Sequence, residues 1–433
     1  MRKFTSCTAI ILSLLFLIFC CCQFAVAAES GTLKVGAAKV DTTPTNLAGL
    51  TNLWRKQFAG VHDHLYVRAL VLDNGKNSAA IVAADLVEFG DTMPLRERIA
   101  KEVGIPADHL ILTASHDHSA PRGGVVSPGA TAQVGGAGTA AYSAWLYDKI
   151  VEAVKQAKAA EQPARMGLAT GKADVNTNRD EYNPEKGWEL GINYDRPSDK
   201  TVWVVKFESL SGDPIAVLFN YGVHSVVAGP ENDQVTGDLA GAAERYVESH
   251  YNDKVVALFT IGPAGDQNPK FIGPGQQPVE APSIYQAVDA QGFMLGAEVV
   301  RVAVRIKNMT ETARIGASEK VITCPTKPRQ PAPGQSAQQA TDLKIHLGLL
   351  ELNDIAFTSV SGEVVTNIYY HLKKSSPLSN TMMITLANDR VGYIIDDAAY
   401  DTPIFERAGS PLQRGCAENG IVDGLVEMIK QNQ

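Results

Sequence analysis

A run of β-favouring apolar residues that ends in a pair of histidines constrains this chain more than any other feature. The run from Leu110 to Ala114 predicts a buried strand, and His116 and His118 follow it before a loop of small residues. Because successive side chains of a strand point to opposite faces, both histidines are expected on one face, with Asp117 pointing away. Two neutral imidazoles on one face are suited to act as one zinc ligand and one proton carrier, or as two ligands of one ion. A polar strand edge with satisfied hydrogen bonds is the plainer alternative, which only ligands elsewhere in the chain can exclude.

The elements before this strand indicate an α/β fold. A buried strand is predicted from Ser78 to Leu86, and a helix from Thr92 to Val103, with Asp91 as its N-cap and Gly104 at its end. The order strand, helix, strand is typical of α/β layers, in which functional residues gather at strand ends. Asp85 is expected either to orient one of the histidines or to act as a buried helix cap.

Three later apolar strands also end in polar side chains. One strand runs from Ile215 to His224, a second covers Val255 to Ile261 and leads into a turn, and a third runs from Ile355 to Glu363. The turn after the second strand contains Asp266, Gln267 and Asn268, and its backbone amides are available to a ligand. Two histidines and a carboxylate at strand ends are the usual ligands of a catalytic zinc ion with one open position. With nine histidines and 47 acidic residues in the chain, accidental sets of this kind are also expected.

The N-terminus has the composition of a secretory signal peptide, predicted at residues 1–27 and followed by a mature domain of residues 28–433. Two basic residues precede an apolar run from about Ala9 to Cys22, and an Ala-x-Ala cleavage site follows. The run is shorter than the about 20 apolar residues that span a membrane, so no transmembrane span is expected after cleavage. A lipoprotein box at Cys20 to Cys22 is the alternative, although the bulky Phe19 precedes it. The protein is therefore predicted to be secreted or periplasmic.

Charge and cysteine content limit what the mature protein binds. Four of the six cysteines lie in the predicted signal peptide, so Cys324 and Cys416 remain and are candidates for one disulfide in an oxidising compartment. Two cysteines are too few for a structural zinc site built from thiolates. The net charge of the chain is −8, and loss of two basic residues with the signal leaves 37 basic against 47 acidic residues, or −10. An acidic chain without basic runs is not expected to bind nucleic acid or anionic lipid.

Polar segments between the strands are predicted to be loops. Asn176 to Arg179 lies in such a loop, and a polar insertion continues to about Asp199. Pro325 to Ala340 is rich in Pro, Gln, Ala and Ser and is expected to form an exposed excursion. His62 and His64 form a second His-x-His pair, for which a second metal site is weighed against ordinary hydrogen bonding.

The segment around the first histidine pair resembles a known family. Thr113-Ala-Ser-His-Asp-His-Ser-Ala-Pro-Arg-Gly-Gly124 is similar to the Thr-His-x-His-Ser-Gly-Pro-Gly-Gly signature of neutral, non-lysosomal ceramidases. The opening Val35-Gly-Ala-Ala-Lys-Val-Asp and the segment Val61-His-Asp-His-Leu-Tyr-Val-Arg-Ala also resemble the N-terminal catalytic domain of that family. The similarity runs from about Leu33 to about Glu406. It implies a single large catalytic domain of mixed β-sheets flanked by helices, and a zinc-dependent hydrolase.

The resemblance also implies roles for individual residues. Carried over position by position, it gives one Zn²⁺ ion with four ligands, which are His116, His224, Glu363 and Tyr400. His118 matches a histidine beside the scissile bond and is expected to carry a proton. Arg179 matches an arginine that helps to hold the substrate, and Gln267 is expected to contact substrate from the turn.

One departure from the family changes the expected mechanism. The family has Gly-Asp-x-Ser-Pro-Asn, whose serine is the proposed nucleophile, and this chain has Asp266-Gln267-Asn268-Pro269 at that place. Because an amide side chain gives no useful nucleophile, an acyl-enzyme route is closed, and attack by metal-bound hydroxide is predicted instead. Asn268 is then expected to donate a hydrogen bond to an oxyanion, with Asp266 helping to position the substrate. The family's immunoglobulin-like C-terminal domain is expected to be missing, which argues against ceramide as the substrate.

Three functional hypotheses follow. The first is an exported zinc hydrolase of an amide, or N-acyl, bond in a small-molecule or lipid substrate. The second keeps the metal but assigns a carbohydrate or cell-wall derivative, because the insertion from Asn176 to Asp199 and the surface are polar. The third is a binding protein that has kept the fold without turnover, suggested by the absent serine. The sequence gives no indication of the oligomeric state.

Overall fold

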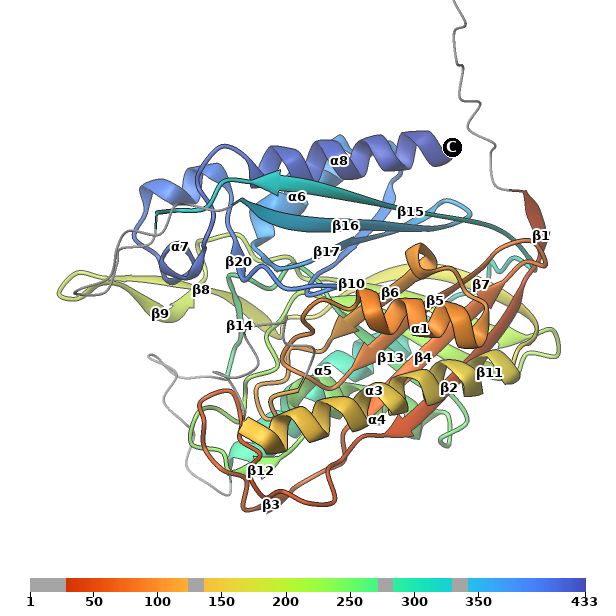
Figure 1. The fold of residues 1–433 in the computed structure, drawn as a ribbon, viewed down its shortest axis with the longest axis horizontal. Coiled ribbons are helices and arrows are strands. Elements are labelled where there is room, and N and C mark those ends of the chain that lie inside the picture. The colour runs from red at the N-terminus through yellow and green to blue at the C-terminus, as the bar shows by residue number, and fades with distance from the viewer. Residues whose placement is uncertain (1–28, 124–135, 272–282, 329–341) are drawn as a thin grey trace, which may run out of the picture.

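Four layers make up the part of the chain that the computed structural model describes, which is residues 29–123, 136–271, 283–328 and 342–433. Two β-sheets pack face to face in the centre, and helices cover the outer face of each sheet (Figure 1). This arrangement confirms the prediction of an α/β fold with mixed sheets flanked by helices. Layers of this kind bury both faces of each sheet, so the strands read as nearly continuous apolar runs.

The larger sheet has eight strands in the order β13-β11-β10-β7-β2-β4-β5-β6. Its β5–β6 and β11–β13 pairs are parallel and its other pairs are antiparallel. Along β4, Ala69 and Val71 face the helices while Leu70 and Leu72 face the second sheet, as the period of two requires. The strands are β2 (Lys34–Asp41), β4 (Tyr66–Asp73), β5 (Ser78–Ala84), β6 (Leu110–Ala114), β7 (Gln162–Lys172), β10 (Thr201–Ser209), β11 (Pro214–Tyr221) and β13 (Val256–Ile261).

The second sheet has five strands, in the order β1-β15-β16-β17-β19. They are β1 (Ser30–Thr32), β15 (Thr312–Cys324), β16 (Leu343–Leu352), β17 (Ile355–Val360) and β19 (Asn380–Ile384). Helices α6 (Thr366–Ser375) and α8 (Ala417–Asn432) cover its outer face. Helices α1 (Met93–Val103), α3 (Gly136–Ala159), α4 (Asp238–His250) and α5 (Ser283–Ala303) cover the larger sheet. Among the described helices, none has both the length and the apolar character needed to cross a bilayer.

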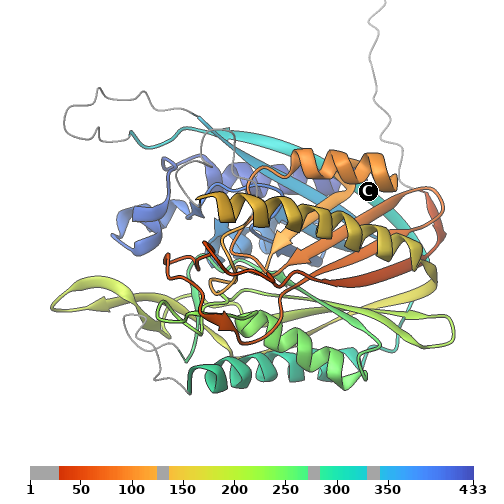
Figure 2. The same ribbon diagram turned by 60° about the horizontal axis from the view of Figure 1, so that its bottom comes forward.

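Short strands at one end of the two large sheets build the functional site. β14 (Gln267–Pro269) pairs with β8 (Asn176–Asn183), which forms a hairpin with β9 (Gly187–Asn193). This hairpin extends outward from the body of the molecule (Figures 1 and 2). β18 (Glu363–Val364) pairs in parallel with β20 (Tyr393–Ile394), and β3 (Gly60–Val61) with β12 (Gln234–Val235). The short helix α7 (Phe405–Gly409) contacts β20.

Predictions that rest on local signals are confirmed by the structure. The helix predicted from Thr92 is α1, and Gly104 follows it in the left-handed conformation with φ 84°. Its N-cap is Thr92, so the N-cap predicted at Asp91 is wrong. The strand predicted from Ile215 is β11, which forms an antiparallel pair with β10. The predicted signal peptide at residues 1–27 and most of 325–340 lie outside the described residues.

The loop predicted at Asn176 to Arg179 is wrong, because these residues form the first half of β8. The side chains of its first five residues are polar yet buried, so no hydrophobic pattern reveals the strand. Hydrogen bonds replace apolar packing: Asn176 Nδ2 donates to the Gly222 carbonyl at 2.6 Å, and Asn178 Nδ2 donates to Asp266 Oδ2 at 2.9 Å. A buried polar strand of this kind is stable only while each group keeps its partner.

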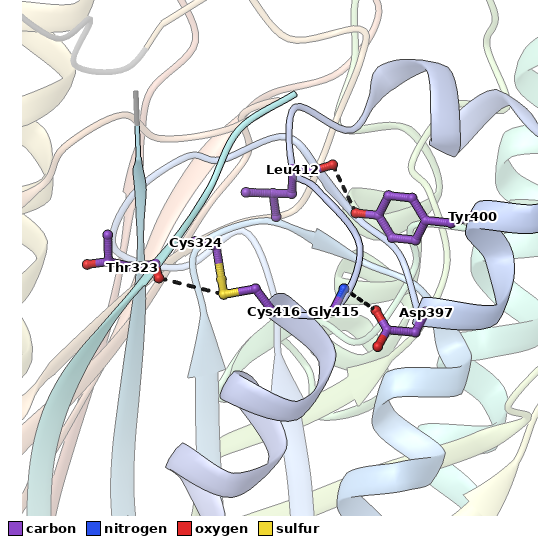
Figure 3. Close-up of a disulfide and its surroundings, with 7 residues drawn as sticks. All are labelled: Thr323, Cys324, Asp397, Tyr400, Leu412, Gly415 and Cys416. Atoms are coloured by element: carbon purple, nitrogen blue, oxygen red, sulfur yellow. Dashed lines mark hydrogen bonds between the residues drawn. A yellow bond between two sulfur atoms is a disulfide. The ribbon is translucent and has the colours of Figure 1, made fainter. Parts of the chain in front are cut away.

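The predicted disulfide between Cys324 and Cys416 is present, with a Cα–Cα distance of 5.7 Å. It joins the last residue of β15 to the residue before α8, across a sequence separation of 92 residues (Figure 3). Cys324 is fully buried in the core beneath α8. The crosslink therefore ties the last helix to the second sheet.

We expect the Cys416→Ser variant to unfold more readily than the wild-type protein. A crosslink across a loop of this size stabilises a fold by about 2–4 kcal/mol through the entropy of the unfolded chain. The midpoint of urea unfolding, followed by circular dichroism, should fall by a corresponding amount. Dithiothreitol should lower the wild-type midpoint and leave that of the variant unchanged. Equal midpoints for the wild type and the variant without reductant would contradict a stabilising role.

Candidate metal centre

Three buried histidines meet at one end of the larger sheet. The side-chain nitrogens of His116, His118 and His224 all lie within 4.8 Å of one another, and this is the one group of potential metal ligands found among the described residues. The first two histidines follow β6 and the third follows β11. The two loops run side by side, because Asp117 and Ser225 form a parallel bridge and the His118 amide donates to the Ser225 carbonyl at 3.1 Å.

The two histidines of the first pair meet for a different reason from the one predicted. β6 ends at Ala114, before either histidine, and His116 has a φ of 58°, which is uncommon for a residue other than glycine. Strand alternation therefore does not place the two rings on one face. The left-handed turn at His116 brings the two Nε2 atoms to 3.3 Å instead. Such strained conformations persist where the surrounding structure holds them, often at functional sites.

Backbone carbonyls orient two of the three imidazoles. His116 Nδ1 lies 2.8 Å from the Val87 carbonyl, and His224 Nδ1 lies 3.0 Å from the Gln267 carbonyl. Because a carbonyl only accepts hydrogen bonds, both Nδ1 atoms carry the hydrogen and both Nε2 atoms present a lone pair. A hydrogen bond of this type on the remote nitrogen is the usual support of a metal-binding histidine.

The Glu363 carboxylate faces these lone pairs. Its Oε2 atom lies 3.2 Å from His116 Nε2 and 3.4 Å from His224 Nε2, and it accepts no hydrogen bond from a described residue. Ligand atoms of a tetrahedral zinc ion with bonds of about 2.0–2.1 Å lie about 3.3–3.4 Å apart. The spacing and chemistry of these three groups therefore fit a zinc ion, with His116, His224 and Glu363 as its ligands.

Protonation states around the cluster follow from burial and from the carboxylate. Burial lowers the pKa of His224 to about 3 and holds that of His118 well below its usual value. Burial also opposes charge on His116, but the adjacent Glu363 outweighs it and raises the pKa of this histidine. Burial alone would raise the pKa of Glu363, whereas contact with His116 and His224 brings it well below the usual value. Metal binding requires an ionised carboxylate and neutral ligand imidazoles, so a cation bound here would displace the proton that Glu363 favours on His116.

Arg179 joins the cluster to the elements around it and is almost completely buried. Its five N–H groups match five contacts: Glu406 at 2.7 Å, the Gly265 carbonyl at 2.6 Å, the Tyr393 hydroxyl at 3.1 Å, Asn268 Oδ1 at 3.2 Å and His224 Nε2 at 3.1 Å. The residue was predicted to hold substrate. Here every N–H donor of Arg179 has a protein partner. A cation bound to His224 Nε2 would displace the Arg179 N–H group that now donates to that atom, and would leave this group available to the substrate.

Tyr393 supplies the phenol in this group, and the structure does not bring Tyr400 there. Tyr393 lies opposite Glu363 in the β18–β20 pair, and its hydroxyl accepts from Arg179. The Tyr400 hydroxyl instead donates to the Leu412 carbonyl at 3.0 Å, near the disulfide (Figure 3). Sequence reasoning missed Tyr393 because only the pairing of two strands distant in sequence reveals its position. The available signal was the apolar pattern of Val391 to Ile395, which is typical of a strand.

The turn after β13 supports the cluster in three different ways. Asn268, at the position of the family's serine, is buried and accepts the hydrogen bond from Arg179. Asp266 accepts from the Thr366 amide and hydroxyl at 3.0 and 2.8 Å, and thus fixes the start of α6. The Gln267 side chain donates to the Pro197 carbonyl at 3.0 Å. The side chains of Asp266 and Gln267 are therefore engaged by the protein, and Asn268 is the residue of the three that contacts the cluster through Arg179.

Other candidate ligands have structural partners. Asp85 accepts from the Tyr66 amide at 2.8 Å and lies 3.5 Å from Arg68, so the prediction that it orients a histidine is wrong. The second histidine pair is also engaged elsewhere. The ring of His62 stacks on Tyr285 with centroids 3.7 Å apart, and His64 Nδ1 lies 2.6 Å from Asp41 Oδ2.

Comparison with known proteins agrees with the resemblance seen in the sequence. Residues 33–320 match the family described as neutral/alkaline non-lysosomal ceramidase, N-terminal. Neutral ceramidase A of Dictyostelium discoideum is 29% identical in an alignment of 275 positions that covers 57% of this chain and 37% of that protein. Neutral ceramidase of Drosophila melanogaster is 26% identical in an alignment of 280 positions that covers 60% of this chain and 39% of that protein.

Solved structures show the same fold. A neutral ceramidase from Pseudomonas aeruginosa superposes with a TM-score of 0.74 at 17% identity, over 93% of this chain and 74% of that one. A ceramidase complexed with C2 gives the same score and identity, over 92% of this chain and 75% of that one. The matched part of the chain spans little more than a third of the length of the two curated relatives. Because the family match covers more than half of its residues, the chain belongs to the neutral/alkaline non-lysosomal ceramidase family.

Proposed function

We propose that this protein is a zinc-dependent hydrolase that cleaves an amide, or N-acyl, bond. The observation that carries the proposal is the group of His116, His224 and Glu363, in which two oriented lone pairs face a buried carboxylate oxygen that accepts no hydrogen bond from a described residue. Two relatives are named neutral ceramidases, which supports an amide as the bond that is cleaved. A zinc ion bound there would polarise a carbonyl group and lower the pKa of a water molecule.

His118 is the residue that we assign to proton transfer. Burial keeps its pKa well below the usual value, so the ring is neutral and able to accept a proton. Its Nδ1 atom is buried and has no hydrogen-bond partner among the described residues. Its ring centroid lies 4.6 Å from that of His116, within the same cluster. A neutral imidazole with one unpartnered nitrogen at the centre suits a general base that later returns the proton to the leaving amine.

Asn268 and Arg179 are assigned to the stabilisation of negative charge. Arg179 binds Asn268 through the side-chain oxygen, so the amide nitrogen of Asn268 points to other groups and is able to donate. Arg179 itself keeps a positive charge beside the cluster, because Tyr393, Glu406 and Glu363 raise its pKa against the effect of burial. A fixed amide and a fixed cation near the reacting carbonyl stabilise an oxyanion without rearrangement.

We also propose that the protein is exported. The Cys324–Cys416 disulfide supports this location, because disulfides of this kind form and persist in oxidising compartments. The charged and apolar N-terminal sequence supports it independently.

The purified protein is expected to bind about one equivalent of zinc, and His116→Ala and Glu363→Gln should each abolish tight binding. Loss of a residue that hydrogen-bonds to a ligand lowers metal affinity roughly 10- to 100-fold, and loss of a direct ligand should lower it further. Metal content by mass spectrometry and hydrolysis of N-acyl amides check this expectation. His64→Ala serves as the control, because this histidine pairs with Asp41 and is half exposed. Retention of one equivalent of zinc by the His116→Ala variant would contradict the proposal.

Tyr393→Phe and Tyr400→Phe form a matched pair that removes one hydroxyl inside the centre and one outside it. Loss of the Tyr393 hydroxyl leaves a buried Arg179 donor without its partner, at a cost of about 1–3 kcal/mol. We expect kcat to fall at least about tenfold in Tyr393→Phe and to stay near the wild-type value in Tyr400→Phe. Steady-state kinetics with equal zinc content measure the difference. The reverse order of effects would show that Tyr400 is the functional phenol.

Asn268→Ala is expected to lower kcat by about 100-fold, as removal of an oxyanion donor does in other hydrolases, with zinc content unchanged. Asn268→Ser tests whether the position has lost a nucleophile. If the serine variant gains a burst of product equal to the enzyme concentration, an acyl-enzyme route is accessible to this fold. Full activity of Asn268→Ala would remove Asn268 from the mechanism.

A further inference from the structure

We propose that the substrate carries a carboxylate close to its scissile amide bond, as an N-acyl amino acid does, and that Arg122 and Arg390 bind this carboxylate. The inference rests on the proposed function and names its substrate class. It arises from a group of arginines beside the metal centre that the mechanism above does not use. This group, called the arginine rim below, consists of Arg55, Arg122 and Arg390.

Arg122 is fixed to a loop that lies against His118. Its amide donates to the Thr51 carbonyl at 3.1 Å, and its Nη1 atom lies 3.4 Å from the Leu53 carbonyl. The same loop contacts the histidine, since the Leu53 amide lies 3.4 Å from the His118 carbonyl and the Trp54 ring centroid lies 5.1 Å from that of His118. The guanidinium of Arg122 is therefore held on the loop that covers the residue assigned to proton transfer.

Arg390 lies beside the backbone that holds two proposed ligands. Its Nε atom lies 2.8 Å from Glu88 Oε2, and Glu88 follows Val87, whose carbonyl orients His116. Arg390 also precedes by two residues Gly392, whose carbonyl accepts from the Glu363 amide at 2.9 Å. Half of the Arg390 side chain is exposed, whereas Glu88 is largely buried.

The charges of this region do not balance. Glu88 interacts electrostatically with Arg390, Arg122, His116 and Glu363, and it is the acid that Arg390 pairs with. Among the described residues, neither Arg122 nor Arg55 lies within ion-pair distance of a carboxylate. Burial and repulsion from Arg390 and Arg55 lower the pKa of Arg122, with Glu88 opposing them. In a chain with a net charge of −8, the arginine rim is a local excess of positive charge that an anion would relieve.

The hydrogen-bond donors of Arg122 also favour the binding of an anion. A guanidinium has five N–H donors, and among the described residues the Arg122 side chain makes a single long hydrogen bond, to Leu53. Arg179, by contrast, has a partner for every donor. An arginine with free donors beside a reactive centre suits a planar carboxylate, which it binds through two parallel hydrogen bonds. Arg122 also stands within the segment Ala-Pro-Arg-Gly-Gly, where the family signature has Gly-Pro-Gly-Gly.

The test uses the zinc-loaded full chain and two substrates with the same acyl chain: N-dodecanoylglycine, which ends in a carboxylate, and N-dodecanoylethanolamine, which ends in a neutral hydroxyl group. The wild type is expected to prefer the glycine conjugate in kcat/KM by at least about tenfold, with the preference shrinking as salt is added. Arg122→Gln and Arg390→Gln should each raise KM for the glycine conjugate by about tenfold and change the kinetics of the ethanolamide by less than about twofold. Arg414→Gln is the control, because this exposed arginine pairs with Asp401 and is not part of the arginine rim.

The outcomes separate this inference from the proposed function. Equal kcat/KM for the two substrates in the wild type would overturn the inference and leave the amide hydrolase standing. Parallel losses on both substrates in Arg122→Gln would show a structural role and would also overturn it. If neither substrate is hydrolysed, the proposed function fails, and calorimetry of N-dodecanoylglycine binding decides the inference. Binding that is at least about tenfold tighter in the wild type than in Arg122→Gln would support the carboxylate site, and equal binding would refute it.

Discussion

The buried guanidinium of Arg179 is the interaction on which the rest of the centre depends. It lies on β8 and reaches His224 after β11, the β13–β14 turn at Gly265 and Asn268, Tyr393 on β20 and Glu406 in α7. A buried arginine is costly unless all its donors are bound, because its charge has left water. All of these partners must therefore be in place for Arg179 to be buried, and together they bring the second histidine, the amide and the phenol into one cluster. This explains why the first five residues of β8 are buried although they carry no apolar side chain.

Backbone atoms do much of the remaining positioning. The carbonyls of Val87 and Gln267 set the orientation of the two histidines, and the carbonyl of Gly392 holds the amide of Glu363. The orientation of these groups therefore does not depend on which side chains stand at the three supporting positions.

The sequence predicted the elements with local signals and the ligands that follow apolar strands. Helix α1 has a Gly end signal, and His116, His224 and Glu363 each stand after a run of buried residues. The sequence could not reveal β8, because polar residues bury there only through partners supplied by distant segments. It also could not select Tyr393 over Tyr400, because the choice depends on the parallel pairing of β18 with β20. The turn at His116 was hidden for a similar reason, since its positive φ is imposed by tertiary contacts.

The placement of the centre between the two large sheets has a mechanical consequence. Two proposed ligands follow strands of the larger sheet, and the third follows β17 of the smaller one. A cation bound by all three would crosslink the two sheets and oppose any sliding of one sheet over the other. By thermodynamic linkage, such a cation raises the free energy of unfolding by about 2.7 kcal/mol when the free ion is at 100 times its dissociation constant. At low concentrations of the ion, the packing of the two sheets would then become less stable, and the proposed hydrolysis would also be lost.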